Sequence, residues 1–509
     1  MKIKRLLCCL VLLLGAAALH AQPVAPPPAA AGAESAPRDV RQLNREEITG
    51  IADGGLLKRL AAGYAKIGDG ERLTWTYERL HELYPNVGDY AFSLAALHAR
   101  KGDKTRTYDM LLKMKEQGYG YDLENDKRFE KVADTQLWKY LSQSLKANMQ
   151  PFGEGKPAFE LPAGDFLHES LAWDPKRRQL LVGSARDGSI QLASMDGKLK
   201  PFIKPDAANG LWGVYAMATD PGRDLLYVAA TASTYFKGLQ ADDLGKSGVF
   251  KFQLSSGKFL ERYPAPGTGP HLLTSLAVGK TGALFVADGV RNLIYKIEGK
   301  ELKVAVADPN LRSIRGLAVS DDGKLLYFAD YELGLFGVHL ATGKGFPVTF
   351  NPKTLVLGGI DGLYWYDGTL VVIENGMHPQ RVLRLTLSAE GSTITKVMPI
   401  DVAHPAFRLP TYGTVAGDAL YFIANSQKGS YGQYGELRAG AEPEPVKVFR
   451  SDLRFAWDQS GINTSATPVR AAPFEEGKQL MQTRPSLLDG GAPRVEPDPA
   501  TPPVEKKGD

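Results

Sequence analysis

Residues 168–182, HESLAWDPKRRQLLV, contain the pattern that decides the fold. An apolar run at residues 169–173 ends at an Asp-Pro turn, and a second apolar run follows at residues 180–182. Alternation of side chains with a period of two, interrupted by a turn, is typical of two antiparallel strands. Five more units have this form, with first runs at residues 215–219, 274–278, 315–319, 361–365 and 412–415.

The spacing of these units is typical of β-propeller blades. Their first runs start 46, 59, 41, 46 and 51 residues apart, and a third strand, such as residues 248–252, and a fourth follow in most units. Radial repetition of four strands at this period predicts a six-bladed β-propeller over residues 152–455. Residues 158–161, which precede the first unit, are expected to pair with the last blade and close the ring, so that no sheet edge is left open.

Residues 48–150 have a helical pattern instead. The pentapeptide AKIGD at residues 65–69 recurs as ARKGD at residues 99–103, an offset of 34 residues, which is the period of tetratricopeptide helix pairs. In each copy the Gly is expected to end one helix and the Asp to cap the next. Pro85 is expected to end the first pair, and a helix near residues 127–146 to cover the end. This segment is either a packing domain or a protein-docking solenoid, and we favour docking because solenoids expose a concave face.

The first 21 residues are expected to be a secretory signal peptide. Basic residues at positions 2, 4 and 5 precede an apolar run of fourteen residues, 6–19, which is shorter than the roughly 20 residues of a membrane-spanning helix. A Pro/Ala-rich linker follows at residues 22–47. Both cysteines, Cys8 and Cys9, lie in the leader, so the mature chain would have no disulfide and no thiolate ligand. The sequence therefore predicts a bacterial periplasmic or secreted protein.

Composition excludes several classes of protein. With 43% hydrophobic and 23% charged residues, the chain of 509 residues is neither wholly disordered nor a polytopic membrane protein, although the Pro-rich stretch at residues 460–509 is expected to be disordered. Without the three leader cations, 58 basic residues face 57 acidic ones, so neither nucleic acid nor an acidic membrane is an expected partner. The sequence has no nucleophile elbow on a strand–helix turn, phosphate-binding loop, dinucleotide fingerprint or His-x-x-x-His pair.

Blade equivalence places one side chain per blade at the same position, next to the inner strand. These six are Glu169, Tyr215, Thr274, Arg315, Asp361 and Tyr412, and all are expected to ring one mouth of the central channel. Loops between second and third strands open on the same face and carry Tyr235, Phe236, Asn375, His378 and Asn425. Aromatic walls with a few charged anchors are what a small-molecule pocket needs.

The first unit, HESLAWD followed by QLLV, resembles the first blade of the senescence-marker-protein/gluconolactonase/luciferin-regenerating-enzyme family, and IDGL at residues 360–363 is similar to that family's Pro-Asp-Gly blade. The second unit, WGVYAMA at residues 212–218, also resembles the yellow/royal-jelly propellers, which are six-bladed too. The gluconolactonase resemblance implies one divalent ion over the channel, held by a Glu, two Asn and an Asp. Glu169 and Asp361 match, but the Asn positions hold Tyr215 and Arg315.

Oxygen donors such as these carboxylates suit calcium, whereas arginine cannot ligate a metal, and Asn209 is the nearby alternative donor. Arg315 therefore decides between two interpretations. Placed between Glu169 and Asp361, its guanidinium would supply the positive charge of a metal and anchor a ligand, or it would only keep two carboxylates from repelling each other.

Two functions remain open. The hypothesis we favour is a non-enzymatic periplasmic or secreted protein that binds a small molecule or a protein partner at the channel mouth, with the helical repeats docking a protein. No cofactor is expected in this case. The alternative is a divergent metal-dependent lactone or ester hydrolase, in which a divalent ion on Glu169 and Asp361, or Arg315 itself, stabilises the developing oxyanion.

Overall fold

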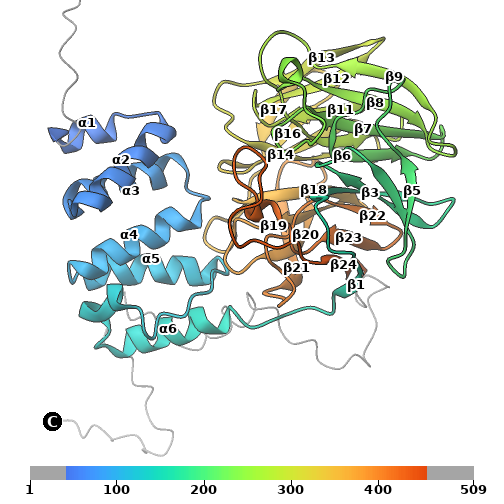
Figure 1. Cartoon of the computed structure of the whole chain (residues 1–509). Coiled ribbons are helices and arrows are strands. Elements are labelled where there is room, and N and C mark those ends of the chain that lie inside the picture. The colour runs from blue at the N-terminus through green and yellow to red at the C-terminus, as the bar shows by residue number, and fades with distance from the viewer. Residues whose placement is uncertain (1–41, 455–509) are drawn as a thin grey trace, which may run out of the picture. The chain divides into compact units, whose positions relative to one another are not determined.

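The computed structural model describes residues 42–454 (Figure 1). The predicted signal peptide, nearly all of the predicted linker and the predicted tail lie outside this range. No helix within it is long and apolar enough to cross a membrane.

Helices occupy the N-terminal part, as the sequence predicts, and α2 to α6 contact one another in chain order (Figure 1). They are α1 (Arg45–Thr49), α2 (Gly54–Ile67), α3 (Gly70–Leu83), α4 (Gly88–Arg100), α5 (Lys104–Glu116), the 3₁₀ helix η2 (Lys127–Val132) and α6 (Gln136–Ala147). The starts of α2 and α4 are 34 residues apart, and so are the starts of α3 and α5. The sequence offset is therefore an offset between structurally equivalent helices.

Local chemistry at the repeated Gly-Asp explains this regularity. Gly68 ends α2 with a left-handed φ of 74°, which costs glycine nothing. Asp69 then caps α3 by accepting a hydrogen bond from the Arg72 backbone N–H at 3.0 Å. In the second copy Gly102 has a φ of 76° and Asp103 caps α5.

The helix predicted near residues 127–146 is wrong as a single element. The chain forms η2, leaves the helical conformation, and then begins α6 as a separate helix. The Thr135 hydroxyl caps α6 by accepting a hydrogen bond from the Trp138 N–H at 3.0 Å. Phe129, Trp138 and Leu141 are buried together in the core of the helical part.

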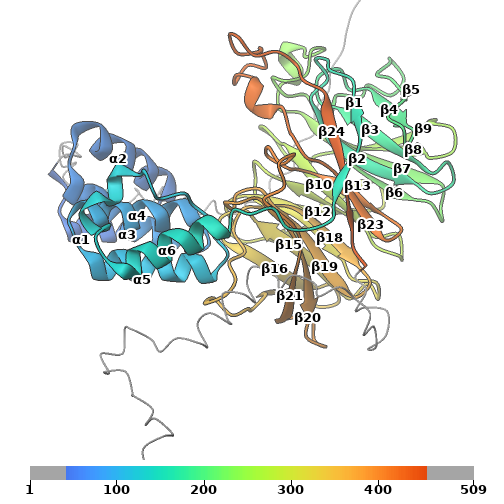
Figure 2. The same cartoon turned by 90° about the horizontal axis from the view of Figure 1, so that it is seen from below.

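Six four-stranded antiparallel sheets confirm the six-bladed propeller. Strands of every sheet are labelled in Figure 2. From the channel outward, blades 1 to 5 are β2 (His168–Asp174), β3 (Gln179–Ser184), β4 (Ile190–Ala193), β5 (Leu199–Ile203); β6 (Gly213–Asp220), β7 (Leu225–Thr231), β8 (Ser247–Gln253), β9 (Phe259–Pro264); β10 (Leu273–Val278), β11 (Leu284–Asp288), β12 (Leu293–Glu298), β13 (Glu301–Ala307); β14 (Ile314–Val319), β15 (Leu325–Asp330), β16 (Gly334–His339), β17 (Lys344–Pro347); and β18 (Ile360–Tyr366), β19 (Thr369–Glu374), β20 (Arg381–Leu387), β21 (Ile394–Val402).

The sixth blade closes the ring with a strand from the other end of the domain. Its strands are β22 (Gly413–Ala416), β23 (Ala419–Ile423), β24 (Val446–Asp452) and, outermost, β1 (Lys156–Leu161), as the sequence predicts. Inner strands of neighbouring blades contact one another around the whole ring, including β2 with β22. Apolar clusters fill the space between blades, and Phe159 and Leu161 of β1 are part of the cluster that joins blades 6 and 1.

Candidate functional site

A β-bulge marks the predicted site position in five of the six blades. In the pairing of the inner strand with its neighbour, the register skips Glu169, Tyr215, Thr274, Asp361, and Arg315 together with Gly316. A bulge inserts an unpaired residue and turns its side chain away from the regular alternation. The sixth residue, Tyr412, directly precedes β22.

These six side chains all line one cavity of about 140 Å³ at the channel mouth. The remaining walls come from loops, and they are Leu272, Tyr331, Asn375, Leu409, Thr411, Ser426 and Lys428. A volume near 150 Å³ holds a molecule about the size of benzene. The cavity therefore suits a small ligand or one end of a larger one.

Asp361 is held rigidly at one side of the cavity. Its Oδ2 accepts hydrogen bonds from the Thr411 hydroxyl at 2.6 Å and from the Asn375 amide at 3.1 Å. Asn375 in turn accepts a hydrogen bond from the Tyr331 hydroxyl at 2.8 Å, and burial raises the pKa of Tyr331 to about 12. The other carboxylate oxygen of Asp361, Oδ1, faces Arg315.

Arg315 is paired on one side only. Its Nη1 is 4.0 Å from Asp361 Oδ1, its Nε donates to the Ser313 hydroxyl at 3.2 Å, and its guanidinium lies over the Tyr331 ring. Burial alone would lower the pKa of Arg315, but Tyr412 and Asp361 more than offset it, so the pKa is raised and the cation is retained. About a third of the side chain is exposed, at 31%, which leaves the guanidinium accessible from the cavity.

Glu169 comes from blade 1, two blades away from Asp361, and its environment differs from that of Asp361. It is 5% exposed, and its Oε1 accepts a hydrogen bond from the Ser426 hydroxyl at 2.6 Å. Burial raises the pKa of Glu169, and the nearby Lys428 and the Ser426 hydrogen bond offset this only in part. The protonated carboxyl is therefore favoured more than in an exposed glutamate.

Two hydroxyl groups at the cavity lack partners. Thr274 Oγ1 is buried and makes no hydrogen bond to any described residue, and Tyr412 Oη lies beside Arg315 without the geometry of a hydrogen bond. Buried hydroxyls normally find a partner, because leaving one unpaired costs about 1–3 kcal/mol. Both oxygen atoms are buried, so neither is exposed to a ligand in the cavity as it stands.

The donor set does not fit the divalent ion that the family resemblance implies. At one of the four ligand positions, the Tyr215 hydroxyl forms a hydrogen bond with the Ser233 hydroxyl at 2.6 Å, and burial raises the pKa of its phenol, so it stays protonated. At another, Arg315 brings a positive charge to the site. Asn209 is engaged in its own turn, where its amide donates to the Lys204 carbonyl at 2.9 Å. Among residues 42–454 no group of three or more His, Cys, Asp or Glu side chains is arranged to hold a metal.

The loop residues predicted for the site are divided by the structure. Asn375 lines the cavity, whereas the other four do not. His378 stacks on Tyr121 of the helical part, and Asn425 is used within its own loop, where it donates to the Pro445 carbonyl. Tyr235 packs against Tyr431, and Phe236 lines a separate surface groove.

Several lining residues were missed by sequence reasoning. Tyr331, Thr411 and Ser426 follow or precede strands in loops whose shapes do not repeat from blade to blade. The sequence offers only their position as a signal: each lies within three residues of the end of a first or second strand of its blade.

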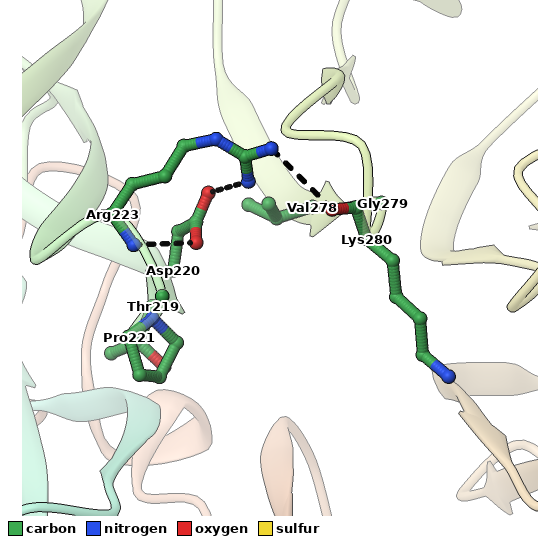
Figure 3. A pocket seen from close by; sticks show the side chains of 8 residues that line it. Thr219, Asp220, Pro221, Arg223, Val278, Gly279 and Lys280 are labelled. Carbon is green, nitrogen blue, oxygen red and sulfur yellow. Dashed lines mark hydrogen bonds and ion pairs between the residues drawn. The ribbon is translucent and has the colours of Figure 1, made fainter.

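A second hollow, of about 540 Å³, lies at the turns that follow the inner strands of blades 2 and 3 (Figure 3). Its cation is already engaged: Arg223 donates to Asp220 at 2.8 Å and to the Thr281 carbonyl at 2.7 Å. Lys280 pairs with Asp321 at 2.9 Å. These contacts join neighbouring blades and leave no unpaired charge for a ligand.

Comparison with known proteins gives no family. No family model matches the chain, and no curated protein matches it. Similar solved structures include the PQQ-bound form of an aldose sugar dehydrogenase from Streptomyces coelicolor (13% identity, 60% of this chain and 100% of that chain, TM-score 0.39) and a putative glucose dehydrogenase from Thermus thermophilus (19%, 58% and 99%, 0.40). A chain of a nidogen/laminin complex also matches (16%, 46% and 80%, 0.34). At these identities and TM-scores the matches carry no argument about activity.

Proposed function

We propose that this protein binds a small polar molecule with an acidic group in the channel-mouth cavity. The observation that carries the proposal is the convergence of six equivalent side chains on one cavity, with the partly exposed Arg315 among them. Two cations, Arg315 and Lys428, face two carboxylates there. Burial raises the pKa of Glu169, so this carboxyl opposes an anionic ligand less than an exposed glutamate would.

The size and polarity of the cavity narrow the class of ligand. About 140 Å³ encloses a carboxylate and a few neighbouring atoms. The Arg315 guanidinium would form the charge-assisted bond to the acid, and polar side chains of the lining would hydrogen-bond hydroxyl groups next to it. Small hydroxy acids and one end of a sugar acid meet these requirements.

A thermal-shift screen tests the proposal. Glycolate, tartrate, gluconate and gluconolactone are added to wild type, to Arg315→Gln, and to Arg312→Gln as a matched control on the exposed neighbouring loop. We expect at least one acid to raise the Tm of wild type and of the control but not of Arg315→Gln, since a ligand at 100 times its Kd stabilises by about 2.7 kcal/mol. Equal shifts in all three proteins, or no shift with any acid, would defeat the proposal.

A metal-dependent lactone or ester hydrolase has less support. Glu169 and Asp361 do line the same cavity, as the resemblance implies, but Arg315 takes a ligand position and carries the wrong charge. Calcium-dependent lactone hydrolysis that is lost in both Glu169→Ala and Asp361→Ala would favour this alternative.

We further propose a tetratricopeptide-like character for the helical part and an extracytoplasmic location. The 34-residue offset between helix starts supports the first, and the basic and apolar leader supports the second. Fractionation of the bacterial host, with mass measurement of the mature N-terminus, tests the location. Docking of a separate protein by the helices stays a prediction.

A further inference from the structure

The loops of blades 4 and 5 that carry two cavity residues also contact the helical part. An apolar cluster joins Ala91, Met114 and Tyr119 of the helices to Val356 and Met377 of the propeller. All five residues are buried. The helices therefore pack against loops at the channel-mouth end of these blades.

Polar contacts fix this packing at several points. Asn86 donates to the Leu333 carbonyl at 2.7 Å, Gln117 donates to the Pro352 carbonyl at 2.8 Å, and the Gly120 N–H donates to the His378 carbonyl at 2.9 Å. The backbones also approach closely, because a Cβ at Gly358 would overlap the Asn86 carbonyl. Such contacts tolerate little sliding of one surface past the other.

A buried ion pair lies at the centre of the contact. Arg381, with 1% of its side chain exposed, pairs with the fully buried Glu374 and also donates to the Gln117 carbonyl of the helical part at 3.1 Å. Removing a partner from a buried pair of this kind is costly, because it leaves buried polar or charged groups uncompensated. The helical part thus supplies one acceptor that this pair needs.

Hydrogen bonds and directly adjacent residues connect these contacts to the cavity. Glu374 directly precedes Asn375, whose amide holds Asp361, and Leu333 lies two residues after Tyr331, whose hydroxyl holds Asn375. The Gly359 N–H donates to the Tyr331 carbonyl at 2.8 Å, and the Asn375 N–H donates to the Gly359 carbonyl at 3.0 Å. The loops contacted by the helices and the loops that hold Asp361 are the same loops.

We infer that the helical part is a positioning element of the cavity: by packing on the loops of blades 4 and 5 it fixes Tyr331 and Asn375, and through them Asp361. Asn86 and Gln117 are the positioning residues. A partner that binds the helices and shifts them would then change the cavity. This consequence for binding rests on the proposed function, whereas the positioning itself does not.

Hydrogen–deuterium exchange on the full chain without ligand tests the inference. The variants are Asn86→Ala, Gly358→Ala and, as a control, Asn310→Ala, which removes only a local bond to Asp308 on an exposed loop. We expect exchange in the segments that cover residues 329–334, 357–362 and 372–382 to rise about fivefold or more in the first two variants. Blades 1 and 2 should exchange as in wild type, which a general loss of stability would not produce.

Two results would overturn the inference. In one, residues 84–121 exchange faster while the three cavity segments are unchanged, so the contact opens without moving the site. In the other, all blades exchange faster together. Since no ligand is used, failure here leaves the thermal-shift test of the proposed function independent. If Gly358→Ala does not fold, Asn86→Ala with Gln117→Ala gives the same comparison with smaller perturbations.

Discussion

The pairing of Arg315 with Asp361 can be measured by a double-mutant cycle. The change is Arg315→Met, Asp361→Asn and both together, with unfolding by urea as the assay. At the 4.0 Å separation of Nη1 and Oδ1, two unit charges interact by about 4 kcal/mol at an effective dielectric constant of 20. With 31% of the arginine side chain exposed, water screens part of this, and we expect a coupling free energy of about 1–2 kcal/mol.

The relative size of the two single-variant destabilisations follows from the other contacts of Arg315 and Asp361. Arg315→Met should destabilise less than Asp361→Asn, because Asp361 keeps the bonds from Thr411 and Asn375 when the cation is lost, whereas the asparagine leaves the cation unpaired and disturbs those bonds. Arg312→Met serves as the control for loss of a positive charge. Additive single effects, with a coupling free energy near zero, would refute the placement of the guanidinium beside Asp361.

Three further predictions concern stability. Burial raises the pKa of Glu169 above 4.5, so the folded state binds more protons than the unfolded state as pH rises past that value. Wild type should therefore lose stability relative to Glu169→Gln as pH rises above about 4.5, and a difference independent of pH would contradict the burial of this carboxyl. Leu161→Ala in β1, which is fully buried, should cost about 2–5 kcal/mol in urea unfolding, whereas Lys156→Ala at the exposed start of that strand should cost little, and equal costs would speak against ring closure by β1. Gly68→Ala should destabilise the protein by about 1–2 kcal/mol because Gly68 has a left-handed φ, while Gly63→Ala in the exposed interior of α2 should stabilise it by about 0.5–1 kcal/mol. Thermal unfolding measures both changes, and effects of the same sign would rule out the assigned end of α2.

The parts of the fold that repeat were predictable from sequence. Each blade repeats the alternation and the turn seen at residues 168–182, so the number of blades, the inner strands and the closing strand were all predicted correctly. The six equivalent residues that line the cavity were grouped in the same way, because equivalent positions in a ring face a common axis. The bulges that turn these side chains inward leave no periodic signal in the sequence.

What did not repeat could not be predicted. The loops between strands differ in length, so nothing in the pattern distinguished Asn375, which lines the cavity, from His378, three residues later, which contacts the helical part. The sequence left open whether Arg315 would point between the two carboxylates. The structure places it near Asp361, while Glu169 is held by Ser426, which depends on the conformation of a loop.

The most direct test of the proposed binding site is a crystal structure of the protein with the acid that gives the largest thermal shift. We predict one molecule in the channel-mouth cavity, with its carboxylate within hydrogen-bond distance of Arg315. A molecule bound elsewhere, with this cavity holding only water, would contradict the proposal.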